Sequence, residues 1–220
     1  MRNRLATVVA ALVVLGTAAP AGASAFEIYI RGGGGFEYLD MTALDYSGAL
    51  NPANYDTLPD SEQDVIDNMT KSYKGEGWAA GGSVGVLLVD FVELGVDFRQ
   101  SGLTFDSGAE ADLTQLVLHV GWHILGTELV ADPSFLFGVG YSYLTTPGLT
   151  LDASRHAAVP GEEVTTNGFI GRAGAALDVR FVSWMSVGLL LDFSFLYFDA
   201  GEDTSWGFNT DLLGRISFHI

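Results

Sequence analysis

The chain has 220 residues, of which 48% are hydrophobic, but lysine and arginine together number only ten and the formal net charge is −17. Nucleic-acid binding is excluded, because neutralising phosphates requires clustered lysine and arginine. The absence of cysteine excludes disulfides, thiolate metal sites and a lipid-modified N-terminal cysteine. A high apolar content with 28 glycines suits one all-β domain whose outer face meets lipid and whose small residues line a narrow interior.

The first residues have the pattern of a cleavable export signal. Arg2 and Arg4 form a short positive segment, residues 5–19 are apolar, and the small residues 23–25 suit a signal peptidase. The alternative, a transmembrane anchor, needs about 20 apolar residues to cross a bilayer, and this run is shorter. We therefore expect residues 1–25 to be a signal peptide cleaved after Ala25, with residues 26–220 as the mature domain.

From residue 26 onward, apolar residues recur with the period of two that is typical of β-strands. Eight such runs are expected, in residues 26–40, 77–88, 92–100, 116–124, 135–143, 169–180, 187–197 and 206–220. Glycine, alanine, serine and isolated charges of both signs occupy the minor face. That face fits the packed interior of a barrel better than the solvated face of a soluble sandwich. The sequence therefore predicts an all-β fold, an eight-stranded antiparallel transmembrane up-and-down β-barrel.

The predicted connections alternate between long and short, as in bacterial outer-membrane barrels with short periplasmic turns and longer outer loops. The longer ones cover residues 41–74, 104–111, 146–165 and 199–205, and the short ones cover 89–91, 126–133 and 181–184. Residues 179–198 are apolar enough to resemble a membrane-spanning helix, but Asp192 and Ser194 interrupt them. A helix here would leave the other strands with an open edge in lipid, so we expect a turn followed by a strand.

Aromatic residues gather near the ends of the predicted strands, where rings prefer the two membrane interfaces. The outer group is Phe36, Tyr38, Trp78, Tyr141, Tyr143, Tyr197 and Trp206, and the inner group is Phe26, Phe91, Trp122, Phe135, Trp184 and Phe218. A soluble aromatic core would not sort its rings to strand ends. The two groups therefore favour a membrane-spanning barrel.

The export signal, the eight strands, the glycines at 32–35 and the C-terminal sequence LLGRISFHI resemble the small outer-membrane β-barrel proteins of the OmpA transmembrane domain, OmpX and OmpW types. The resemblance rests on architecture and covers the whole mature chain. It implies a location in the bacterial outer membrane and contact with lipid and lipopolysaccharide. It also implies handling by periplasmic chaperones and by the barrel-assembly machinery, which recognises a terminal aromatic; here that aromatic is Phe218, two residues before the end.

Charged residues on the minor face form a candidate lumen network, because charges in a narrow, low-dielectric space must pair. Arginine forks suit such pairing with carboxylates. The expected members are Arg31, Glu93, Asp97, Arg99, Arg172, Asp178, Arg180, Asp192, Asp211 and Arg215, with Glu27 on the same face. An ion path or gate is one interpretation. A side-chain plug is the other, and we favour it because the interior of an eight-stranded barrel is normally filled.

Two histidines, His119 and His123, share this face four residues apart. In a strand that spacing separates them by about 13 Å, too far to bind one metal ion. We expect two polar residues with satisfied hydrogen bonds, and a pH-sensitive lumen is the alternative.

A catalytic set was sought at the outer rim, where Asp152, Ser154, His156 and Glu162 cluster in one predicted loop. Local clustering in a loop is a poor signal for a triad, and the His-x-Ser motif of the lipid A deacylases is absent. We therefore expect no enzyme activity, no cofactor and no catalytic or metal-binding residues.

The predicted outer loops are strongly acidic. A solvated, repulsive rim is the default interpretation, and divalent cations that bridge to lipopolysaccharide phosphates are a further candidate partner. The acidic residues are Asp40, Asp45, Asp56, Asp60, Glu62, Asp64, Asp67, Asp106, Glu110, Asp112, Glu162, Glu163, Asp199, Glu202 and Asp203. The sequence thus favours a non-enzymatic barrel with a filled lumen that serves envelope structure or surface contacts. A narrow passage for small or hydrophobic molecules, as the OmpW resemblance implies, and a lipid hydrolase are the alternatives.

Overall fold

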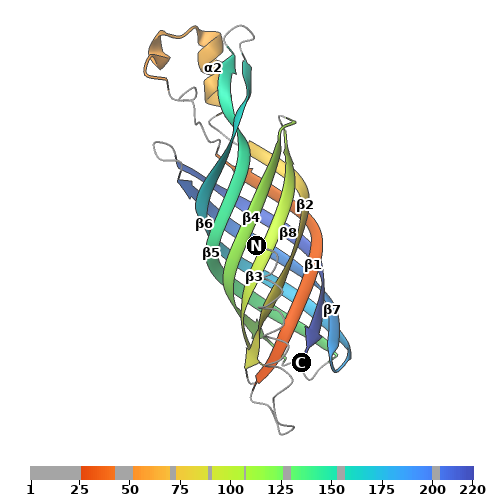
Figure 1. Ribbon diagram of the computed structural model, residues 1–220. Coiled ribbons are helices and arrows are strands. Elements are labelled where there is room, and N and C mark those ends of the chain that lie inside the picture. The colour runs from red at the N-terminus through yellow and green to blue at the C-terminus, as the bar shows by residue number, and fades with distance from the viewer. Residues whose placement is uncertain are drawn as a thin grey trace, which may run out of the picture.

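The computed structural model describes residues 26–42, 52–69, 73–88, 91–106, 108–125, 130–152, 157–199 and 204–220, so the predicted export signal lies outside the described residues. Alternating apolar and polar residues form long strands, and two short helices lie between the first two of them (Figure 1). The strands are β1 (Phe26–Met41), β2 (Tyr73–Leu88), β3 (Val92–Phe105), β4 (Glu110–His123), β5 (Ala131–Asp152), β6 (Ala157–Val182), β7 (Met185–Asp199) and β8 (Thr204–His219). The helices are η1 (Tyr55–Thr57) and α2 (Asp60–Met69).

The strands close into one barrel in which each strand pairs antiparallel with the next and β8 pairs back to β1. Following paired residues once around the barrel from Arg31 returns to β1 at Met41, ten residues farther along. With a rise of about 3.3 Å per residue and strands about 4.8 Å apart, this shift tilts the strands by roughly 40° to the barrel axis. The predicted closed, up-and-down barrel of eight antiparallel strands is confirmed.

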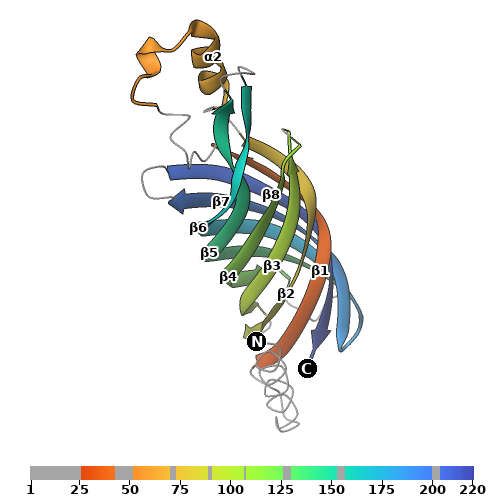
Figure 2. The same cartoon turned by 45° about the horizontal axis from the view of Figure 1, so that its top comes forward.

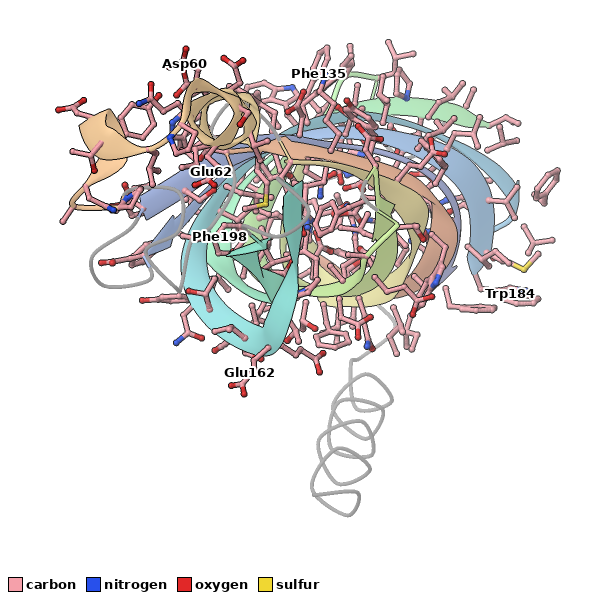
Figure 3. All side chains as sticks on the ribbon, turned by 90° about the horizontal axis from the view of Figure 1, so that it is seen from above. Asp60, Glu62, Phe135, Glu162, Trp184 and Phe198 are labelled. Carbon is pink, nitrogen blue, oxygen red and sulfur yellow. The ribbon has the colours of Figure 1, made fainter. Side chains whose placement is uncertain are left out.

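The outer surface of the barrel is apolar. Large hydrophobic side chains in the middle of the strands are 52–68% exposed, among them Phe98, Leu118, Val139, Phe169, Phe193 and Phe208. The residues predicted for the two aromatic groups also lie outside wherever their side chains are described, and Figure 3 shows Phe135 and Trp184 pointing away from the ring of strands. Soluble proteins seldom expose a continuous apolar surface of this extent, whereas lipid is a favourable neighbour for it.

Some strand pairs approach so closely that only glycine fits. A Cβ atom on Gly35 would lie 2.0 Å from the Leu212 carbonyl oxygen, and one on Gly77 would lie 1.9 Å from that of Gly102. Each separation is far below van der Waals contact, so the backbone would have to move to accept a side chain. These glycines let neighbouring strands approach within the barrel wall.

The prediction of a loop at residues 146–165 is wrong. β5 continues to Asp152 and β6 begins at Ala157, and the two strands pair beyond the barrel as a two-stranded ribbon that Figure 2 shows rising from one side. The register shifts between Pro147 and Leu149, where proline interrupts the ladder of hydrogen bonds. Backbone pairing between threonine- and valine-rich segments outweighs the polar composition from which a loop was predicted.

The predicted connection at residues 41–74 contains α2, which the sequence analysis missed. Asp60 and Glu62 lie in its first turn, where carboxylates favour the positive end of the helix dipole. Ile66 is buried, and the helix contacts β6. None of the described helices has the length and apolar content needed to cross a bilayer.

Candidate functional site in the barrel lumen

Polar and charged side chains from every strand except β2 form a layered network in the lumen, beginning at the end where the chain's C-terminus lies. At this inner mouth, Arg180 Nη2 donates to Glu27 Oε1 at 3.1 Å. His219 Nδ1 also contacts this carboxylate, and its Nε2 lies 3.1 Å from the Ser186 hydroxyl. Each of these side chains comes from a different strand, so closure of the barrel is what brings them together.

Glu93 is the hub of the next layer, and it is 2% exposed. Arg31 donates to both of its carboxylate oxygens, with Nη1–Oε1 at 2.9 Å and Nη2–Oε2 at 3.1 Å. His119 Nε2 lies 2.8 Å from Oε1, and His123 Nε2 lies 3.2 Å from Oε2. One buried carboxylate therefore joins three side chains from two other strands, which makes it the most connected group of the network.

The two histidines extend the network to further carboxylates. His123 Nδ1 lies 2.7 Å from Asp132 Oδ2, and His119 Nδ1 lies 3.2 Å from Asp97 Oδ2. The Tyr29 hydroxyl is 2.9 Å from His119 Nε2. Each histidine thus stands between two acids. The spacing of the two rings along β4 lets both contact the same Glu93.

Farther from the mouth, two arginines hold the remaining predicted acids. Arg215 Nε donates to Asp178 Oδ1 at 2.8 Å, and its Nη2 donates to Oδ2 of the same carboxylate. Arg99 forks between strands β7 and β8, with Nη2 donating to Asp192 Oδ2 at 2.8 Å and Nη1 to Asp211. Planar guanidinium groups allow both bidentate and bridging geometries.

Arg172 joins this layer to the histidine layer. Its Nη1 donates to Asp97 Oδ2 at 3.2 Å, its Nη2 donates to the side-chain oxygen of Gln115, and its Nε lies 3.7 Å from Asp192 Oδ2. Asp97 therefore links Arg172 to His119. The network is continuous from the hub to the middle of the barrel.

Glu37 differs from the other inward acids. It is fully buried, and Ser101 and Asn209 donate to its two carboxyl oxygens. Within the described part of the chain, no cation lies at ion-pair distance from it. Asp211 is its direct partner on the neighbouring strand β8. Glu37 lies at the end of the charged layers, and the inward residues that follow it on β1, Leu39 and Met41, are apolar.

An apolar plug fills the outer end of the lumen. Phe198, labelled inside the ring in Figure 3, belongs to it. Its members are 0–9% exposed and come from seven of the eight strands and the β3–β4 turn. They are Leu39, Met41, Tyr73, Leu103, Phe105, Ala109, Ala111, Leu113, Val117, Leu144, Ile170, Leu196 and Phe198. A few buried polar side chains, among them Ser101, Thr166 and Ser205, lie beside these residues, but no described ion pair lies within the lumen at this level, so the plug separates the charged layers from the outer end of the barrel.

The cavities inside the charged layers are small. One of about 40 Å³ is lined by Arg31, Arg99, Arg215 and the glycines at 33 and 81, and another of about 20 Å³ lies beside Tyr29 and His219. Each has room for only one or two water molecules. A larger hollow, about 1100 Å³, is lined mainly by outward-facing apolar side chains such as Phe137 and Phe193, and also by the inward residues His119, Arg172 and Ser194.

All ten residues predicted for the lumen network face the interior and make ion pairs. The prediction left out His119, His123 and His219, which contact that network, and also Asp132, which contacts His123, and Glu37, which accepts from Ser101 and Asn209. It also missed the apolar plug. The signal for the plug was present in residues 195–198, where both faces of the strand are apolar and the alternation disappears.

Ser186, His219 and Glu27 have the connectivity of a catalytic triad, since the histidine lies between a hydroxyl and a carboxylate. Ser186 is 3% exposed, however, and the adjoining cavity of about 20 Å³ is too small for an ester or amide substrate. The geometry therefore describes a hydrogen-bonded closure of the mouth. The outer set that includes Ser154 and His156 lies outside the described residues, and no described group of three His, Asp or Glu side chains has the arrangement of a metal site.

Comparison with known proteins identifies the fold. Neisserial surface protein A (NspA) matches 90% of this chain and 98% of its own at a TM-score of 0.53, with 10% sequence identity. The chain has the fold of the small outer-membrane β-barrels. Pseudomonas aeruginosa provides two further matches, the outer membrane protein OprG (13% identity, 90% and 98% coverage, TM-score 0.46) and the N-terminal β-barrel domain of OprF (14%, 88% and 97%, 0.43). No protein-family model and no curated protein sequence matches the chain.

Proposed function

We propose that the protein is a non-enzymatic outer-membrane barrel with a sealed lumen, which contributes to envelope structure and presents an acidic outer surface. Residues 1–25 would direct export and be cleaved after Ala25. The continuous apolar exterior supports contact with membrane lipid, because its burial in water-free surroundings is favourable by about 25 cal/mol per Å². The barrel-assembly machinery and periplasmic chaperones are the partners that such a barrel requires during biogenesis.

The apolar plug is the observation that carries the sealed lumen. An ion that passed Glu37 would meet the closely packed leucines and phenylalanines of the plug and only a few neutral hydroxyl groups, too few to replace its hydration shell. On the inner side, ion pairs occupy the interior that an open channel would leave to water. Two barriers of different chemistry therefore support the plug interpretation over a gate or a passage for small molecules.

The outer surface supports a role in contacts with anionic lipid through divalent cations. Carboxylates lie on α2 and on the β5–β6 ribbon, and Figure 3 shows Asp60, Glu62 and Glu162 at the periphery of the outer end. Lys74, paired with Asp40 at 3.6 Å, is the basic residue that the described part of this surface offers. Oxygen ligands from the rim and from lipopolysaccharide phosphates could share Ca²⁺ or Mg²⁺.

Planar-bilayer recording of the purified, refolded protein tests the sealed lumen. We expect no steady single-channel steps, whereas regular steps in the wild-type protein would support the alternative of a narrow passage. The membrane placement has a separate test. The mature chain should need detergent for solubility and should migrate differently on gels before and after heating, because a closed barrel resists unfolding by detergent at room temperature. A chain that is soluble without detergent contradicts the placement.

A further inference from the structure

The groups that face the ring nitrogens of two lumen histidines indicate which of these nitrogens carry protons. A carboxylate oxygen only accepts hydrogen bonds, and a neutral imidazole has one N–H and one bare nitrogen. His123 has a carboxylate oxygen at each nitrogen, Asp132 at 2.7 Å from Nδ1 and Glu93 at 3.2 Å from Nε2. A neutral ring would point a lone pair at one of these acids. Both contacts are attractive only if both nitrogens carry protons.

His119 is in a related position. Its Nε2 lies 2.8 Å from Glu93 Oε1 in a hydrogen bond, and its Nδ1 lies 3.2 Å from Asp97 Oδ2, at ion-pair distance but without a hydrogen bond. The side chain is buried and only 1% exposed, so solvent water is not available to bridge a deprotonated ring nitrogen and the carboxylate beside it. The Tyr29 hydroxyl next to Nε2 can rotate to accept, and so it tolerates a protonated ring.

His219 provides a contrast within the same lumen. Its Nδ1 contacts the Glu27 carboxylate and lies 3.1 Å from Arg180 Nη2, and its Nε2 faces the Ser186 hydroxyl, which can donate. Unlike either nitrogen of His123, the Nε2 of this ring therefore faces no carboxylate.

Charge balance leads to the same conclusion independently. The described inward acids number eight, and the inward arginines number five. Cationic His119 and His123 raise the positive groups to seven, and the one acid with no cation at ion-pair distance is Glu37, held by Ser101 and Asn209. The acids are Glu27, Glu37, Glu93, Asp97, Asp132, Asp178, Asp192 and Asp211, and the arginines are Arg31, Arg99, Arg172, Arg180 and Arg215.

The second proton on His123 provides a cation for the buried carboxylate of Asp132. Asp132 is 7% exposed, and among the described cations His123 is its ion-pair partner. A neutral His123 would leave a buried carboxylate without a cation, at a cost that proteins avoid. The titratable, charged and polar groups around the two rings come from six other strands: Tyr29 and Arg31 from β1, Glu93 and Asp97 from β3, Asp132 from β5, Arg172, Asp178 and Arg180 from β6, Ser186 from β7, and Arg215 and His219 from β8. The titratable residues of β2, Tyr73, Lys74 and Glu76, lie at the other end of that strand.

We propose that His119 and His123 are structural imidazolium cations that bind two protons into the sealed lumen and hold Glu93, Asp97 and Asp132 together. The protons make these side chains part of the ion-pair network, so the barrel is most stable when both rings are charged. When the two rings lose these protons in alkaline solution, their ion pairs are lost and the inner layers become less stable. This inference goes beyond the proposed envelope role, because the protonation of the two histidines does not depend on the location or the partners of the protein.

Nitrogen NMR of the full mature barrel in detergent, labelled at histidine, tests the protonation directly. At pH about 8, where a free imidazole is neutral, we expect doubly protonated rings at positions 119 and 123. Single His119→Gln, His123→Gln and His219→Gln variants assign the signals, and heat-modifiable migration verifies folding. Neutral signals at positions 119 and 123 in the folded wild-type protein overturn the proposal.

Asp132→Asn sharpens the test, because it removes one of the two acids at His123 and leaves the surroundings of His119 unchanged. We expect the His123 ring to lose its second proton at a pH roughly one unit lower, which corresponds to a tenfold change in proton affinity. Ser186→Ala, which alters only the hydroxyl at His219, is the matched control and should leave the His123 signal in place. An unchanged His123 signal in Asp132→Asn contradicts the proposal.

The stability of the barrel gives an independent measurement. Above pH about 6.5 the unfolded chain releases the histidine protons, while the folded chain keeps two, so the folded state binds more protons and loses stability as the pH rises. The equilibrium constant for unfolding in urea should increase about tenfold per pH unit for each retained proton, or about a hundredfold for two. A constant that does not change between pH about 7 and 8 contradicts the proposal. The two single histidine variants should each show roughly half of the wild-type slope.

Discussion

The two ends of the lumen are filled by side chains of different chemistry. On the inner side, paired charges around Glu93 and Arg99 fill the space, and each pair depends on a partner from another strand. On the outer side, the packing is mainly between leucine, methionine and phenylalanine side chains, without ion pairs among the members of the plug. Apolar packing loses stability gradually as volume is removed, whereas a buried charge network loses much of its stability when one partner disappears. A single substitution should therefore lower the free energy of unfolding more in the inner layers than in the outer plug.

The largest effect is expected from Glu93→Gln. The amide keeps the size of the side chain but leaves Arg31, His119 and His123 without their shared charge. We expect a loss of about 3–5 kcal/mol in the free energy of unfolding, the usual cost of removing one partner from a buried ion pair. Urea titration, followed by the change in gel migration of the unheated protein, measures it. Glu76→Gln on the exposed face of β2 is the control and should change stability by less than about 0.5 kcal/mol.

In the plug, Leu196→Ala should cost about 2–4 kcal/mol, because it removes three buried carbon atoms and leaves a cavity. The variant should still fail to conduct, since the ion pairs below the plug remain in place. Urea titration and bilayer recording check both statements. Leu189→Ala, on the lipid-facing side of the same strand and 60% exposed, provides a matched comparison with a smaller loss. Single-channel steps in Leu196→Ala would show that the plug alone seals the lumen.

Variants of the Asp178–Arg215 pair distinguish two quantities: the free energy of unfolding that is lost when one partner is removed, and the net contribution of the intact pair to that free energy. Asp178→Asn alone should destabilise by about 3 kcal/mol, because the guanidinium of Arg215 keeps its charge without its partner. The double variant Asp178→Leu with Arg215→Met should recover most of that loss, since apolar residues of similar volume replace buried pairs at little cost. Equal losses in the single and double variants would show that the pair itself, rather than the unpaired charge, determines the stability.

The smallest effect is expected outside the barrel. The Tyr55 hydroxyl donates to Asp67 of α2, and this hydrogen bond raises the pKa of Tyr55 to about 12. Because the phenol keeps its proton at all ordinary pH values, the contact should persist across them. Tyr55→Phe should leave barrel stability unchanged and make cleavage within α2 by a protease only a few-fold faster. A change in the urea midpoint of the barrel would contradict this separation.

The barrel and its inward charges were predictable from sequence because period-two alternation assigns a face to each residue directly. The arrangement of partners was not, since it depends on the register between strands distant in sequence. His119 and His123 show this limit: their spacing along β4 is visible in the sequence, yet only the pairing of β4 with β3 and β5 places acids at their nitrogens. The plug was missed because apolar residues on both faces of a strand end carry no periodic signal, as in residues 195–198.

The paired charges have a consequence for how the chain assembles. Arg31 and Ser217 are separated by 186 residues, Arg99 and Asp211 by 112, and Arg31 and Glu93 by 62. A sheet that had entered lipid before β1 met β8 would carry these charges without their partners. Such an intermediate is costly enough to be sparsely populated, so insertion and closure should occur together as one cooperative, and comparatively slow, event.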